Sequence, residues 1–119
     1  MQISFQQFEK IKIDMDKVFA RVCLKKIKNK FPEGLAKAGV VENAEEDTMC
    51  KCIKEAKSYG IILQNDLLLY LECIVLLGLD FNKNESLRWP SEILNDSKLN
   101  GEQKMNMISE NLIFSPVQK

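Results

Sequence analysis

Histidine is absent from the 119 residues of this chain. Its absence removes the side chain that most often serves as general base, proton shuttle and metal ligand. The four cysteines do not replace it, because a cysteine nucleophile needs an adjacent base and their spacing is not that of a zinc knuckle. We therefore expect no catalytic residue, no metal site, no cofactor and no enzymatic activity.

Chain breakers and long hydrophobic runs are also scarce. With 5 glycines and 3 prolines, the composition favours helices over many short strands joined by turns. The most apolar run, residues 67–79, contains Glu72 and is shorter than the roughly 20 residues that cross a bilayer. Residues 1–5 do not resemble a secretion signal. We predict a cytoplasmic protein with no membrane segment and with free thiols.

The chain also lacks a net charge, since 17 basic residues balance 17 acidic ones. This balance makes nucleic acid an unlikely partner. Residues 1–30 nevertheless carry eight basic and three acidic side chains, a net of +5, and the remainder carries −5. A nucleic-acid-binding regulator that uses the basic face of the first helix stays open as an alternative. An acidic cluster follows at the start of the next predicted helix: Glu42, Glu45, Glu46 and Asp47.

A long amphipathic helix is predicted at the start of the chain. Ser4 and Gln7 form a capping box, and Ile3 can pack against Phe8 across it. The helix should end near Lys30, ahead of Pro32. Its apolar residues recur at spacings of three and four and form one continuous stripe opposite the lysines: Phe5, Phe8, Ile11, Met15, Val18, Phe19, Val22, Cys23 and Ile27. In so small a domain, part of this stripe is available for a homodimer.

The rest of the chain predicts four more helices and one isolated turn. Apolar residues surround the helix before Gly78, which places it at the centre of the core. We expect its Glu72 to lie at a rim or to pair with a lysine of the first helix. In the last helix, Met105, Ile108 and Leu112 should face inward, while Lys104 and Glu110 face outward. The turn is predicted at residues 35–38. The second helix should begin at an Asn43 cap and end at Gly60, and the third should begin at an Asn65 cap and end at Gly78. The fourth helix should begin at Trp89-Pro90, and the fifth at an Asn100 cap with Gln103.

These elements define the predicted fold class. The chain is expected to be all-α, a single-domain antiparallel bundle of about five helices around a buried central helix. The domain spans residues 1–119, with residues 115–119 as a short tail. No internal repeat or low-complexity tract divides it.

Protein binding is the function that these features favour. Its candidate contact regions are the acidic cluster and the loop before the Trp89-Pro90 helix, whose aromatic and arginine residues are types enriched at interfaces. Trp89 itself is expected to pack over the central helix. The candidate partner-binding residues are Glu42, Glu45, Glu46, Asp47, Asp80, Phe81, Arg88 and Trp89.

Several packing and capping residues resemble a small helical family encoded beside bacterial type VI secretion spike and effector genes. The resemblance covers most of the chain. Its residues are Phe31-Pro32, the segment Ala56 to Ile61 that ends in Tyr-Gly-Ile, Asp66, Tyr70, Gly78, Phe81, and Trp89 through Ile93-Leu94 to Asp96. The resemblance implies a non-enzymatic partner of a secreted effector or toxin. It leaves two roles open. The first is an immunity protein, and the second is a chaperone or adaptor that loads the effector on the secretion spike.

Overall fold

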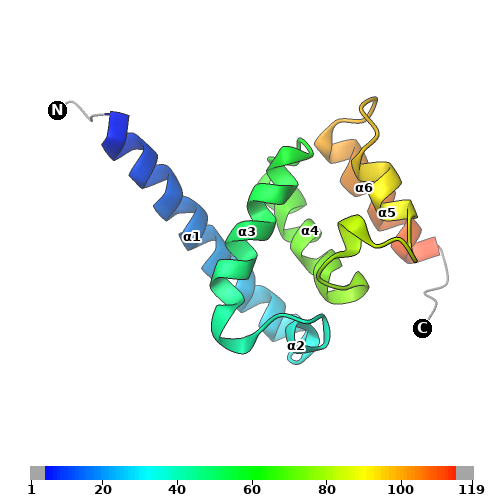
Figure 1. Ribbon diagram of the computed structural model, residues 1–119, viewed down its shortest axis with the longest axis horizontal. Helices are drawn as coiled ribbons and strands as arrows, with labels where there is room; N and C mark the ends of the chain where they lie inside the picture. Colours follow the sequence, from blue (N-terminus) through cyan, green and yellow to red (C-terminus); the bar gives the residue numbers. More distant parts are fainter. Residues whose placement is uncertain (1–4, 115–119) are drawn as a thin grey trace.

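The core is built around one helix, α4 (Gln64–Leu77), as its nearly continuous apolar sequence predicts. The computed structural model describes the backbone of residues 5–114 and the side chains of residues 16–112. Figure 1 shows α4 between α3 and the pair α5 and α6. It contacts α1, α2, α3 and α6. The predicted central position of this helix is confirmed, and its buried residues are Leu67, Tyr70, Leu71, Cys73 and Ile74.

The described residues form an all-α bundle, as predicted. Five helices lie where the sequence places them, and the isolated turn after Pro32 is a sixth, α2. Successive helices α3 and α4 run antiparallel because only a short link joins them (Figure 1). The elements besides α4 are α1 (Phe5–Lys30), α2 (Gly34–Lys37), η1 (Glu42–Ala44), α3 (Glu45–Ser58), η2 (Phe81–Lys83), α5 (Trp89–Leu94) and α6 (Gly101–Phe114).

Glycine ends α3 as the sequence predicts. Gly60 has a φ of 87°, in the left-handed region that favours glycine. This turn lets the amide of Ile61 donate to the carbonyl oxygen of Ala56 at 3.1 Å, and the Ile61 side chain is buried. The start of α6 packs against the same turn so closely that a Cβ at Gly101 would lie 2.2 Å from the carbonyl oxygen of Gly60. The link between α3 and α4 is thus fixed by two glycines.

Local capping predictions have mixed outcomes. The box at α6 is confirmed: the amide of Asn100 donates to Gln103 Oε1 at 2.9 Å, and the amide of Gln103 donates to Asn100 Oδ1 at 2.8 Å. The predicted caps Asn43 and Asn65 are wrong. Asn43 lies in the 3-10 turn that leads into α3, and Asn65 lies inside the first turn of α4, so the N-cap positions belong to other residues. The predicted Ser4 cap and the 115–119 tail lie outside the described residues.

Lys104 of α6 corrects another prediction. Its side chain is only 7% exposed instead of facing outward. Its Nζ donates to the carbonyl oxygen of Tyr59 at 2.9 Å, at the end of α3 where the helix dipole is negative. The lysine stem packs along the bundle while its charged head is satisfied. Met105 and Ile108 are buried as predicted.

Candidate functional site

The apolar stripe of α1 is divided between two faces. Cys23 and Ile27 are buried against the bundle, but Val18 is 55% exposed and Val22 is 45% exposed. At about 100° per residue, the helix turns these two valines away from the face that carries Ile27. Part of the predicted stripe is therefore left uncovered by the described residues, at Val18 and Val22. We call the side of α1 that carries these two residues the open face.

Ion pairs join α1 to α3. Arg21 Nε lies 2.8 Å from Glu46 Oε2, and Lys28 Nζ lies 2.6 Å from Glu45 Oε1. The basic first helix and the acidic cluster therefore neutralise each other in part. A third pair joins the two helices with the charges reversed. The Nζ atom of Lys57 in α3 lies 3.0 Å from the Oδ1 atom of Asp16 in α1.

The pair of Arg21 and Glu46 shifts the pKa of both side chains. The hydrogen bond from Arg21 lowers the pKa of the Glu46 carboxyl, and the same bond raises the pKa of Arg21. A further pair joins α1 to α4, where Lys30 Nζ lies 3.6 Å from Glu72 Oε1. The prediction that Glu72 pairs with a lysine of the first helix is confirmed. Glu45 and Glu46 are thus already paired with cations of α1.

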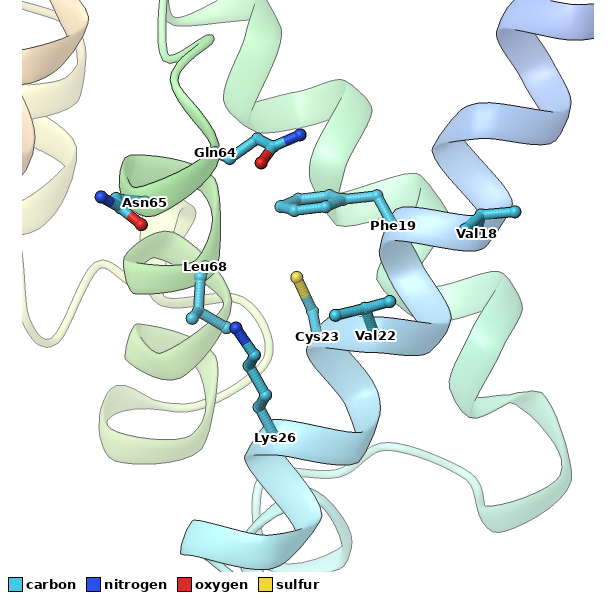
Figure 2. Close-up of a pocket in the computed structure, with 8 residues that line it drawn as sticks. All are labelled: Val18, Phe19, Val22, Cys23, Lys26, Gln64, Asn65 and Leu68. Carbon is cyan, nitrogen blue, oxygen red and sulfur yellow. The ribbon is translucent and has the colours of Figure 1, made fainter.

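A groove of about 400 Å³ lies between the open face of α1 and the start of α4. In Figure 2, Phe19 and Cys23 extend from α1 towards α4, whereas Val18 extends away from α4. Leu68 is an apolar residue on the α4 side of the groove, and Lys26 adds a positive charge at its edge. The full lining is Val18, Phe19, Val22, Cys23, Lys26, Gln64, Asn65 and Leu68.

The predicted contact loop is partly a core element. Phe81 is 1% exposed, and its ring centroid lies 5.1 Å from that of Tyr70 in α4. Asn82 is also buried, and its Nδ2 donates to the hydroxyl of Tyr59 at 3.0 Å. Phe81 therefore offers almost no surface to a partner. Trp89 is partly buried against the core.

The two predicted contact regions remain separate surfaces. The acidic cluster lies beside α1 at the start of α3, while the loop from Asp80 leads from the end of α4 to α5 (Figure 1). Glu42, Asp47, Asp80 and Arg88 are exposed. Val18 and Val22 are not among the predicted partner-binding residues, although the sequence leaves part of their stripe available for a homodimer. Their spacing is that of core residues, and a sequence alone does not show how wide a face the rest of the bundle covers.

Cys23 is the one cysteine that lines the groove. All four cysteines are free thiols, as predicted. Burial raises the pKa of Cys23 to about 11 and the pKa values of Cys52 and Cys73 to about 12, so these thiols are protonated at neutral pH. Over the residues that the structure describes, histidine, cysteine and carboxylate side chains form no group of three that would hold a metal ion.

Within the described part of the chain, none of the helices combines the length and the apolar character needed to span a bilayer. The candidate site consists of the apolar open face on α1, the groove beside it, and the ion pairs that join α1 to α3. Comparison with known proteins found no matching family model, no matching curated protein and no matching solved structure.

Proposed function

We propose that this protein works by binding another protein, without catalysis. The observation that carries the proposal is the pair of half-exposed valines, Val18 and Val22, beside the groove between α1 and α4. Adjacent exposed apolar side chains that border a groove are typical of a surface that a protein partner covers. Ile62 and Leu63, in the link between α3 and α4, are also exposed.

The partner that we propose is a secreted effector or toxin of a type VI secretion locus, met in the cytoplasm. This proposal is supported by the sequence resemblance alone. An immunity protein is the first role, and a chaperone or adaptor for loading the effector is the second. Among the predicted contact residues, Glu42, Asp47, Asp80 and Arg88 have exposed side chains for such a partner, and Trp89 has a partly exposed one.

The charge distribution gives less support to the nucleic-acid alternative. Arg21, Lys28 and Lys30 of α1 already pair with carboxylates of α3 and α4. A phosphate backbone would have to compete with these carboxylates for three of the cations on the helix. Binding of this kind would weaken steeply as salt is raised, which a shift assay with DNA or RNA measures directly.

Co-expression with the effector-like product of a neighbouring gene tests the effector proposal. Growth rescue together with a stable complex supports immunity, whereas a complex without rescue supports an adaptor or chaperone. Val22→Glu and Arg88→Glu then separate the open face from the loop as the contact surface. If the folded wild-type protein neither rescues growth nor co-purifies with the effector, the effector proposal fails.

A further inference from the structure

Asn100, at the start of α6, is the only asparagine of the chain that precedes a glycine. Asparagine is a thermolabile residue, because the backbone nitrogen of the next residue can attack its side-chain amide. A glycine at that next position hinders the attack least, since it has no Cβ. Among the asparagines of the sequence, Asn100 is therefore the one that we expect to lose its side-chain amide most readily when the chain is unfolded.

The folded structure holds Asn100 by three hydrogen bonds. Its amide donates to Gln103 Oε1 at 2.9 Å, and its Oδ1 accepts from the amide of Gln103 at 2.8 Å. Its carbonyl oxygen accepts from the amide of Lys104 at 2.9 Å. Two reacting groups must be close together and aligned, whereas these bonds fix both the side chain and the following peptide group of Asn100 in the capping geometry.

The neighbouring Gly101 is fixed as well, because it is buried against the turn that ends α3. A Cβ at Gly101 would lie 2.2 Å from the carbonyl oxygen of Gly60, so this contact has no room for an additional atom. The Asn100 side chain is itself exposed, so water and hydroxide reach it as soon as the hydrogen bonds open. The packing of α6 on this turn, and not the exclusion of solvent, is what protects Asn100.

We propose that Asn100 is a site of spontaneous deamidation whose rate is set by how often the first turn of α6 opens. In the open state hydroxide removes the amide proton of Gly101, and the nitrogen attacks the Cγ atom of Asn100. The new C–N bond closes a cyclic imide, and the side-chain nitrogen leaves as ammonia. Water then opens the imide on either side of the Gly101 nitrogen, which gives aspartate or isoaspartate at position 100.

The two products differ in how they fit the fold. Aspartate is as good an N-cap as asparagine, so it can accept again from the amide of Gln103. In isoaspartate the main chain runs through Cγ, which adds an atom between position 100 and Gly101. Because the contact of Gly101 with Gly60 has no room for one, isoaspartate should weaken the packing of α6 on the end of α3. The modification then releases α6 slowly and without return.

Peptide mass spectrometry of protein kept in mildly alkaline buffer tests the site and its protection. In urea that unfolds the chain, Asn100 should convert before any other asparagine. In the folded wild type its conversion should be about tenfold slower or more, because only the open state reacts. Conversion of another asparagine first, or equal rates of Asn100 in the folded and unfolded protein, would overturn the proposal.

A variant of α6 tests whether opening sets the rate. Lys104→Ala removes the donor to the Tyr59 carbonyl and should raise the rate in the folded protein about tenfold. Lys98→Ala, at an exposed lysine, should leave the rate unchanged. Circular dichroism shows that both variants are folded, and the wild-type comparison in urea decides the matter if Lys104→Ala is not. A folded Lys104→Ala that reacts at the wild-type rate contradicts the dependence on opening.

The effect of the longer main chain is measured on the isoaspartyl form, separated from the aged wild type by chromatography. Asn100→Asp is the matched control, because it has the same charge and an ordinary backbone. The isoaspartyl form should unfold at a temperature lower by about 4 °C or more. Equal unfolding temperatures of the two proteins would show that the contact of Gly101 with Gly60 tolerates the added atom, and the proposed release of α6 would fail.

Discussion

Helices α1 and α4 are both rich in apolar residues, but the fold uses them differently. Other elements surround α4 on most sides, so Leu71 and Ile74 are fully buried. The described part of α1 is covered on one side only, and its open face keeps Val18 and Val22 half-exposed. Apolar periodicity therefore identifies a surface that avoids water, but it does not distinguish a surface covered by this chain from one covered by another protein.

The largest test of this contrast is a pair of truncations. Ile74→Ala should lower the free energy of unfolding by roughly 2 to 5 kcal/mol, because it leaves a cavity in the fully buried core. Val22→Ala should change the free energy of unfolding by less than about 0.5 kcal/mol. Urea denaturation measures both free energies, at a protein concentration low enough that the unfolding midpoint no longer depends on it. Equal losses at the two positions would remove the distinction between α4 and the open face.

A smaller effect is expected where α6 supports the end of α3. Lys104→Ala removes the donor to the Tyr59 carbonyl and should cost about 1 to 3 kcal/mol of unfolding free energy. Lys98→Ala is the control, because Lys98 is an exposed lysine. Thermal unfolding of the two variants compares them. If both variants have the same unfolding temperature as the wild type, the buried lysine makes no net contribution to stability.

The covered side of α1 can be probed through the reactivity of its thiol. Cys23 lies on the covered side, and burial raises its pKa to about 11. Its reactive thiolate should therefore become abundant only as the pH approaches that value. In the native protein we expect alkylation at partly exposed Cys50 first, with Cys23, Cys52 and Cys73 protected. Peptide mass spectrometry over time measures the order, and rapid native labelling of Cys23 would mean that α1 does not stay packed.

The smallest expected effect concerns the ion pair between Arg21 and Glu46. Because Arg21 lowers the pKa of Glu46, their pair contributes to stability above the ordinary pKa of a glutamate. That contribution is lost as the pH falls through the lower pKa of the folded state. An NMR pH titration should show the pKa of Glu46 rising in Arg21→Gln. An unchanged Glu46 pKa in that variant would show that the pair does not persist in solution.

Local signals in the sequence predict much of the fold. The glycine end at Gly60, the box of Asn100 and Gln103, and the proline-led start of α5 depend only on neighbouring residues, and all three are confirmed. The central position of α4 follows from its composition. These features need no knowledge of which helix packs against which.

The misplaced residues depend on long-range packing instead. Lys104 is buried because the end of α3 happens to supply a carbonyl acceptor 45 positions earlier in the chain. Val18 and Val22 are exposed because α3 and α4 cover a narrower face of α1 than its apolar stripe. Phe81 resembled an interface residue, yet it packs on Tyr70. A candidate contact surface therefore consists of those residues of an apolar stripe that the rest of the bundle leaves exposed.

The most direct test follows the valine methyl signals of the wild-type protein by NMR as the effector-like product of the neighbouring gene is added. We expect the signals of Val18 and Val22 to shift together as the open face becomes covered, while the signals of Val41 stay in place. Shifts confined to Val41 or to other surfaces, or no shift at Val18 and Val22 over the whole range, would contradict the claim that the open face of α1 is a protein contact surface.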